Sequence, residues 1–176
     1  MLRTPDDLFS LLDRLGIPSV TVRHRAVFTV AESQDVCTGI PGAHTKNLFL
    51  KDKKGRLFLL TAGQEAVLDL KHLHHALRAS GRLSFCSADL LYEVLGVTPG
   101  SVTTLAAAND AEGRVTVILE AGLMAADQIS LPPLVNTMTT TLKRDDLIRF
   151  LDAVDHKPQI LPLDCATAGA DSGVPA

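Results

Sequence analysis

The sequence predicts a single mixed α/β domain. Its 176 residues suffice for one buried core but are too few for two domains of ordinary size. Hydrophobic residues make up 46% of the chain and charged residues 21%, which is typical of a globular protein. Apolar residues at helical spacing near both ends, and a β-branched apolar run at residues 115–120, indicate helices packed on a sheet.

The first predicted helix follows Thr4. Thr4 is a favoured N-cap residue, Pro5 suits the first helical position, and Asp6 and Asp7 match the positive end of the helix dipole. Gly16 is placed to end this helix. The next elements expected are a short strand at residues 20–23, a short helix at 31–36 and a turn at 39–42.

Residues 42–55 are the stretch around which the rest of the chain is organised. A Gly-containing loop leads into an apolar run, and a basic turn separates it from a second apolar run at residues 57–60. This pattern predicts a β-hairpin in which Gly55 supplies a positive φ. Lys46 lies where the loop meets the strand, and burying its ammonium without a partner would be costly. Lys46 therefore faces either a cleft that binds an anionic or carbonyl-bearing ligand, or solvent at the strand end.

The second half of the chain predicts further elements in order. They are a helix from Asp69, a helix at residues 88–95 capped by Ser87 and closed by Gly96, a central strand at 115–120, a helical turn at 121–126, a strand at 135–142, a helix from about Arg144 and a strand at 159–161. Alternation along the strand at 135–142 would place Asn136 and Thr140 on one face, where they could line a small polar pocket or close the core. The glycine- and proline-rich residues 96–104 are either an ordinary connection or a loop whose amides bind a phosphate or carbonyl oxygen.

Charge and cysteine content exclude several classes of protein. The formal charge of -3 gives no overall attraction to nucleic acid, so a polyanion would have to bind a local basic patch. The three widely spaced cysteines indicate neither a disulfide framework nor a zinc site, which fits a reduced cytoplasm. Asp69, His72 and His75 recur at a spacing that drifts around a helix, so surface histidines are expected rather than metal ligands. No apolar run has membrane-spanning length.

Motifs of nucleophile-elbow hydrolases, Walker loops, zinc proteases and dinucleotide-binding proteins are absent from the sequence. The ordered set of segments instead resembles the YbaK-like editing domain associated with prolyl-tRNA synthetase, in its free-standing alanyl-tRNA(Pro) deacylase branch. The segments are KNLFLKDKKG at residues 46–55, GVTPGSVT at 96–103, Asn109-Asp110, Asn136-Thr137-x-Thr139-Thr140 and His156-x-Pro158. This resemblance spans the first helix to about Leu161.

The resemblance implies a mixed, largely antiparallel curved sheet flanked by helices, over residues 1–162. The small, polar composition of residues 163–176 predicts a disordered tail. It implies cytoplasmic, metal-free and cofactor-free hydrolysis of the ester on mischarged tRNA(Pro). Prolyl-tRNA synthetase is a further candidate partner, and neither DNA nor a membrane is expected. The family's essential lysine falls on Lys46, and the loop residues Gly100 and Ser101 would stabilise the reacting ester. Residues implied to bind substrate are Asn47, Val102, Thr103, Asn136, Thr140 and His156, and those implied to offer charge to the tRNA backbone are Lys51, Lys53, Lys54 and Arg56.

Three positions depart from the family pattern. Asp155 precedes His156 where the family has glycine, and Thr104 replaces a frequent proline. Pro132 replaces the histidine of a Phe-His-Pro-Leu segment, which puts substrate preference in question more than the fold. Two alternatives therefore stay open: a non-catalytic tRNA- or synthetase-binding module of the same fold, or a deacylase for another small amino acid, cysteine or serine.

Overall fold

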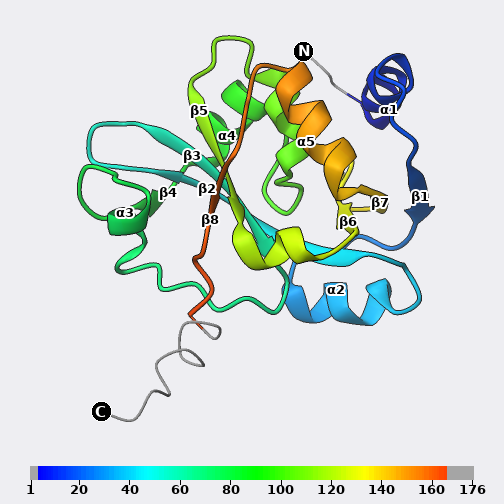
Figure 1. The fold of residues 1–176 in the computed structure, drawn as a ribbon, viewed down its shortest axis with the longest axis horizontal. Coiled ribbons are helices and arrows are strands. Elements are labelled where there is room, and N and C mark those ends of the chain that lie inside the picture. The colour runs from blue at the N-terminus through cyan, green and yellow to red at the C-terminus, as the bar shows by residue number, and fades with distance from the viewer. Residues whose placement is uncertain (1–3, 166–176) are drawn as a thin grey trace.

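The structure is a computed structural model that describes residues 4–165. Within these residues one sheet of eight strands has the order β1-β7-β6-β2-β3-β5-β8, with β4 paired to β2 (Figure 1). The strands are β1 (Val20–Arg23), β2 (Ala43–Lys51), β3 (Leu57–Gly63), β4 (Ser84–Phe85), β5 (Val115–Glu120), β6 (Gln128–Leu131), β7 (Met138–Lys143) and β8 (Gln159–Leu161). The helices are α1 (Pro5–Arg14), α2 (Val30–Cys37), α3 (Leu73–Ala76), α4 (Ala88–Leu95) and α5 (Arg144–Ala153), with 3-10 helices η1 (Thr104–Asn109) and η2 (Ala121–Ala125).

The sheet is mixed, as expected. The pairs β1·β7, β6·β7, β2·β3 and β2·β4 are antiparallel, whereas β2·β6, β3·β5 and β5·β8 are parallel. The predicted hairpin is the β2·β3 pair, and Gly55 at its turn has a φ of +82°. The apolar run at residues 115–120 is β5, which has a neighbour on each edge, as its composition predicts.

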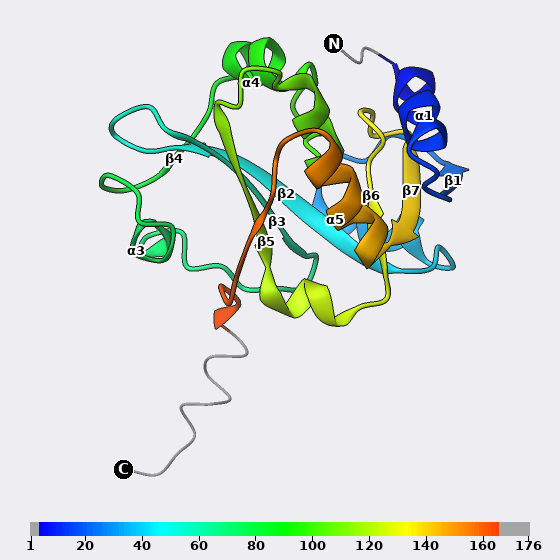
Figure 2. The same cartoon turned by 45° about the horizontal axis from the view of Figure 1, so that its top comes forward.

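Both faces of the sheet are covered at β2 and β3, because alternate side chains enter two separate cores. Phe49 and Leu59 join the larger core, to which α1, α4, α5 and η1 also contribute. Leu50 and Leu60 join a smaller core with Leu73 of α3. Figure 2 shows α4 and α5 on one side of these strands and α3 on the other. The two cores hold β2 rigidly, which matters because β2 carries Lys46 and Asn47.

The helix ends follow the predicted capping chemistry. Thr4 and Asp7 form a reciprocal capping box at α1, with Thr4 N to Asp7 Oδ2 at 3.0 Å and Asp7 N to Thr4 Oγ1 at 3.2 Å. Ser87 accepts from Leu90 N at the start of α4, and Gly96 ends that helix at φ +67°. These contacts explain why both helices begin where the sequence indicates.

Two elements are shorter than predicted. The helix expected from Asp69 is confined to Leu73–Ala76, because the Asp69 carboxylate instead binds His72 Nδ1 at 2.7 Å in the preceding turn. The strand expected at residues 135–142 begins only at Met138. Before it, Leu134 has a φ of +69°, and Asn136 bonds to Val27 through both its side chain and its carbonyl. Strand β6 was not predicted, and it ends at the Pro132-Pro133 pair.

The described C-terminal residues pack against the domain. Leu163 is buried, its amide donates to Glu120 Oε1, and Asp164 Oδ1 accepts from Val67 N. Most of the tail expected at residues 163–176 lies outside the described residues. Among residues 4–165, no helix is both long and apolar enough to cross a membrane.

Candidate active site at the open edge of strand β2

The site lies where one edge of β2 lacks a strand partner. On that edge, β6 pairs with Ala43 and His44, and β4 pairs with Leu50 and Lys51. The other edge pairs continuously with β3 from Thr45 onward. Phe49 O also accepts from Cys86 N, directly after β4, at 3.0 Å. Residues 45–48 therefore have no strand partner on this edge, and a cavity of about 270 Å³ lies there.

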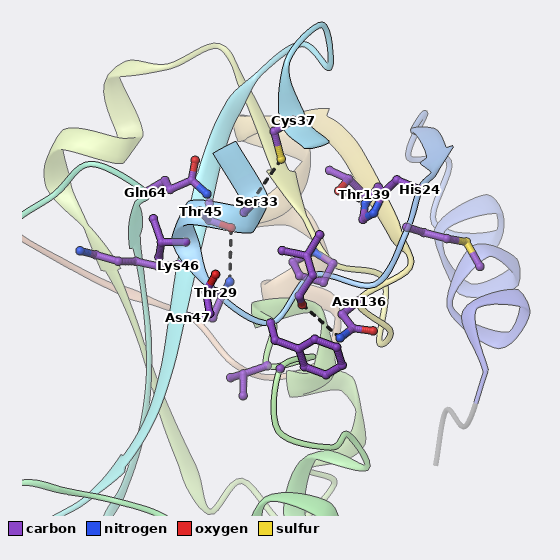
Figure 3. Close-up of a pocket in the computed structure, with 17 residues that line it drawn as sticks. His24, Thr29, Ser33, Cys37, Thr45, Lys46, Asn47, Gln64, Asn136 and Thr139 are labelled. Carbon is purple, nitrogen blue, oxygen red and sulfur yellow. Dashed lines mark hydrogen bonds between the residues drawn. The ribbon is translucent and has the colours of Figure 1, made fainter. Parts of the chain in front are cut away.

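The cavity wall comes from segments far apart in the sequence (Figure 3). The wall contains backbone and side-chain donors, apolar groups, the His24 imidazole and the Cys37 thiol. It contains no aspartate or glutamate, although the chain has 20 acidic residues. The lining residues that bear on function are His24, Phe28, Lys46, Asn47, Gly100, Val102, Pro132, Asn136, Met138 and Thr139. The site therefore favours an anionic ligand and offers no carboxylate as a general base.

Lys46 lines this cavity, but its ammonium is held at the rim. Nζ donates to the carbonyl of Ala66, in the loop after β3, and Figure 3 shows the side chain directed away from Thr139 and Asn136. Because strand side chains alternate, Lys46 and Asn47 leave β2 on opposite faces. The ammonium is thus placed to contact the outer part of a ligand rather than its centre.

Asn47 is fixed by hydroxyl groups. Its Oδ1 accepts from Thr61 Oγ1 at 2.6 Å and from Thr104 Oγ1 at 3.3 Å, and those two hydroxyls also contact each other. Its Nδ2 donates to Thr45 Oγ1 at 3.3 Å. These bonds set the orientation of the amide, so that the second N–H of Nδ2 remains as a donor for a carbonyl or ribose oxygen.

The loop at Gly100 approaches the cavity closely because Gly100 has no side chain. Its φ is +89°, and a Cβ there would lie 3.0 Å from Phe28 Cδ1 and 3.4 Å from Asn136 Nδ2. The Ser101 amide is not available to a ligand, since it donates to Thr98 O at 3.0 Å and Ser101 is buried. Within the described contacts, the amides of Gly100 and Val102 have no acceptor. They are the loop donors that a ligand could use.

Sequence reasoning did not select His24 or Thr139, which form a hydrogen-bonded pair in the cavity wall. His24 Nε2 lies 2.8 Å from Thr139 Oγ1, and Nδ1 lies 2.7 Å from the Arg25 carbonyl. Thr139 stood in the segment that carried the family resemblance, and His24 directly follows the strand predicted at residues 20–23. That strand pairs with β7, with Val22 opposite Thr139, which brings His24 close to the Thr139 hydroxyl. A histidine is thus present in the same cavity as Pro132, although it comes from another element.

The structure places the other predicted residues in different surroundings. Asn136 lines the cavity, whereas Thr140 is fully buried and bonds to Thr21 Oγ1 at 2.8 Å. The prediction that Asn136 and Thr140 share one face of a strand is wrong, because Asn136 precedes β7 and lies in a loop. Thr103 is buried and caps η1 through Leu105 N. His156 is also buried, and its Nε2 lies 2.9 Å from Asp110 Oδ2, outside the cavity.

The cations of the β2·β3 turn lie outside the cavity. Lys53, Lys54 and Arg56 are exposed, Lys51 is half-buried, and within the described residues none of them belongs to an ion pair. Asp52 is buried inside this turn and accepts from the amides of Lys54, Arg56 and Ser80. Burial opposes ionisation of Asp52, but the three amide bonds outweigh it, so its pKa lies below the ordinary value. The Asp52 carboxylate is hydrogen-bonded to backbone amides inside the turn, so the exposed charges of the turn are positive.

The histidines of the α3 region do not assemble a metal site. Among the described residues, no group of three His, Cys, Asp or Glu side chains is arranged to hold a metal ion. His72 pairs with Asp69, and its ring stacks with that of His75 at a centroid distance of 6.3 Å.

Comparison with known proteins agrees with this geometry. The profile of the aminoacyl-tRNA editing domain matches residues 24–150, which include every cavity residue discussed above. Prolyl-tRNA synthetase associated domain-containing protein 1 of Danio rerio is 38% identical over 160 residues, covering 90% of this chain and 86% of the relative. Prolyl-tRNA editing protein ProX of Acetoanaerobium sticklandii is 32% identical over 143 residues, covering 81% and 87%.

A solved structure shows the same fold. The crystal structure of a candidate trans-editing enzyme for prolyl tRNA synthetase superposes with a TM-score of 0.70 at 17% identity, covering 93% of this chain and 99% of the other. The family profile and the two relatives span most of the sequence. The chain therefore belongs to the aminoacyl-tRNA editing domain family.

Proposed function

We propose that this protein is a trans-editing deacylase that hydrolyses the ester of mischarged tRNA(Pro), with alanyl-tRNA(Pro) as its substrate. The observation that carries the proposal is the cavity at the open edge of β2, where Lys46, Asn47 and the free amides of the Gly100 loop meet without a carboxylate. The names of the relatives, a prolyl-tRNA editing protein and prolyl-tRNA synthetase associated proteins, support tRNA(Pro) as the carrier.

The reaction requires little covalent chemistry from the protein, since an aminoacyl ester is already activated. The Gly100 and Val102 amides would donate to the carbonyl oxygen as it becomes an oxyanion, and one such donor contributes about 3 to 4 kcal/mol. The Asn47 amide would hold a ribose or carbonyl oxygen. With no carboxylate in the wall, the attacking water would be assisted by the free hydroxyl or amine of the substrate.

Lys46 would act as a positioning cation. Its ammonium lies at the rim beside the Ala66 carbonyl, where a terminal phosphate or ribose could replace that contact. An ester does not form a Schiff base, so covalent attack by Lys46 is not part of the proposal. No metal or cofactor is assigned a step.

Selectivity for alanine would be steric. Pro132 and Met138 line the cavity. Because Pro132 stands where the family pattern has a histidine, this part of the wall is apolar. A wall of this kind separates substrates that differ by one methylene by only about 1 to 3 kcal/mol. Proline would be excluded by the size of its ring. Serine and cysteine are close to alanine in size, so their rates of release would show how selective the cavity is.

The test is release of amino acid from tRNA(Pro) charged separately with alanine, serine, cysteine and proline. We expect the fastest release from alanyl-tRNA(Pro) and none from prolyl-tRNA(Pro). Faster release of serine or cysteine would reassign the substrate, and no release from any of the four would favour the non-catalytic binding module.

The matched variants are Lys46→Ala and Lys157→Ala, the latter an exposed lysine outside the cavity. Lys46→Ala should abolish deacylation with an unchanged circular dichroism spectrum, and Lys157→Ala should retain it. Full turnover by Lys46→Ala would remove Lys46 from the mechanism.

A further inference from the structure

A second cavity adjoins the first across the Gly100 loop. It has a volume of about 200 Å³ and shares three wall residues with the first: Asn47, Gly100 and Val102. Since one water occupies about 30 Å³ in the liquid, each cavity has room for a ligand group rather than for a single ordered water. The two cavities therefore form neighbouring compartments on either side of one loop.

Each compartment carries an exposed phenylalanine. Phe28 lines the first and is 68% exposed, and Phe85 lines the second and is 60% exposed. The chain has only six phenylalanines, one tyrosine and no tryptophan, so aromatic side chains are scarce. Two exposed aromatic rings, each in the wall of a cavity beside the same loop, offer flat apolar surfaces to a ligand group in that cavity.

The second compartment contains no charged side chain. Its wall is apolar apart from Asn47 and the Cys86 thiol. Burial raises the pKa of Cys86 to about 11, which keeps this thiol neutral at physiological pH. Neither compartment thus contains a group that would repel a nucleic acid electrostatically.

The compartments lie along β2, which then reaches the basic turn. Lys46 belongs to the first compartment, Phe49 to the second, and Lys51 pairs with Ser84 beside Phe85. At a rise of about 3.3 Å per residue, Lys46 and Lys51 are roughly 17 Å apart along the strand. Beyond Lys51 lie the exposed cations Lys53, Lys54 and Arg56. The order along β2 is therefore the first compartment with Phe28, the second compartment with Phe85, and the positive surface.

We propose that the two compartments bind the unpaired 3′ end of the aminoacylated tRNA, with the terminal adenine stacked on Phe28 and the preceding cytosine stacked on Phe85. This inference rests on the proposed function, which places the ester in the first compartment. Proteins that bind single-stranded RNA commonly stack unpaired bases on aromatic side chains beside a positively charged surface. The Gly100 loop would separate the two nucleotides, and the basic turn would meet the phosphates that follow.

The first experiment compares three esters: alanyl-adenosine, alanyl-CCA trinucleotide and alanyl-tRNA(Pro). Phe85→Ala should raise KM for the trinucleotide and the tRNA by about 5- to 150-fold, the range for loss of one stacked base, and leave alanyl-adenosine unchanged. Phe28→Ala should raise KM for all three. In both variants kcat should change little, because binding rather than transition-state stabilisation is lost.

Matched variants separate stacking from apolar bulk. Leucine at either position should behave like alanine, whereas tryptophan should restore KM, since only tryptophan presents an aromatic face. Tyr92→Ala is the control, because Tyr92 is 57% exposed but lines neither compartment.

The second experiment measures binding without hydrolysis. Because the chain contains no tryptophan, Phe28→Trp and Phe85→Trp each create a single fluorescent reporter. Uncharged CCA trinucleotide should quench both reporters in a saturable way and leave Tyr92→Trp unaffected.

The two experiments separate this inference from the proposed function. Saturable quenching without deacylation of any ester would overturn the proposed function and support binding of the 3′ end in the two compartments. Normal deacylation with unchanged KM in Phe28→Ala and Phe85→Ala would overturn base stacking on the two phenylalanines and leave the proposed function standing. A KM increase for alanyl-adenosine in Phe85→Ala would contradict the assigned order of the two bases.

Discussion

Thr139 donates its hydroxyl hydrogen to His24 in the wall of the first cavity. The Arg25 carbonyl, 2.7 Å from His24 Nδ1, can only accept, so Nδ1 carries the proton of the neutral imidazole. Nε2, 2.8 Å from Thr139 Oγ1, is then the acceptor. This arrangement leaves the lone pairs of the Thr139 oxygen for a donor on the ligand, such as the α-amino group of the aminoacyl ester.

A double-mutant cycle on His24 and Thr139 tests this relationship. Thr139→Val should raise KM for alanyl-tRNA(Pro) about tenfold, since one hydrogen bond of about 1.4 kcal/mol is lost. His24→Ala should act through the same hydroxyl, so the double variant should be little worse than Thr139→Val alone, with a coupling energy of about 0.5 to 3 kcal/mol. Thr139→Ser restores the hydroxyl and should recover KM; strictly additive effects would show that the pair does not act as a unit.

Substitution of Gly100 should separate backbone strain from steric blockage. Gly100→Ala places a Cβ 3.0 Å from Phe28 at a φ of +89°, whereas Gly113→Ala adopts a φ of +67° with no atom within 4 Å. Both should lose about 1 to 2 kcal/mol of unfolding free energy from the left-handed backbone. Only Gly100→Ala should also lose deacylation, measured as kcat/KM. Equal activity in the two variants would show that the close approach at Gly100 is not needed.

The hairpin should loosen in acid through Asp52. Its pKa is lower in the folded than in the unfolded protein, so its stabilisation is complete above the ordinary value of 3.8 and is lost as pH falls through the folded pKa. Asp52→Asn replaces one acceptor by a donor and should cost about 1.5 to 3 kcal/mol near neutral pH. Urea denaturation should show that the difference in unfolding free energy between Asp52→Asn and the unsubstituted protein becomes smaller as pH falls through the folded pKa of Asp52. Asp13→Asn, at an exposed carboxylate, is the control.

His156 should affect stability more than catalysis. Its ring and Asp110 are both nearly inaccessible, and Asp110 Oδ2 also accepts from Val115 N at 2.8 Å. His156→Ala leaves a buried carboxylate with fewer partners and should lower the unfolding free energy by about 3 kcal/mol or more. KM should be unchanged at temperatures where the variant is folded, with exposed His75→Ala as the reference. A raised KM at full stability would instead support the contact with substrate that the resemblance implies.

Local chemistry made much of the fold predictable. Thr4, Ser87 and Gly96 bound their helices as expected because capping depends on neighbours in sequence. The strand at Asn136 was misjudged because its backbone bonds to Val27, more than a hundred residues away, and no local pattern reports such a contact. Pairing of β1 with β7 brought His24 to Thr139 in the same non-local way.

The site shows the same division. The structure brings five residues selected through the resemblance to one cavity: Lys46, Asn47, Gly100, Val102 and Asn136. The sequence could not show that the Lys46 ammonium binds Ala66, or that the Ser101 amide is used within its own turn. Both facts depend on how loops fold back on the sheet.

The interrupted pairing of β2 has a consequence for how such a protein can change. An unpaired strand edge is ordinarily a hazard, because it invites pairing with another chain. Here the opening is short and is bordered by α2, the Gly100 loop and the Pro132 loop, while the two cores lie on the faces of the sheet. Cavity residues of α2 and of the Pro132 loop, such as Ser33 and Pro132, belong to neither core, whereas Val102 of the Gly100 loop packs against the larger one. Substitutions at such positions would change the shape of the cavity while leaving the packing on both faces of β2 unchanged.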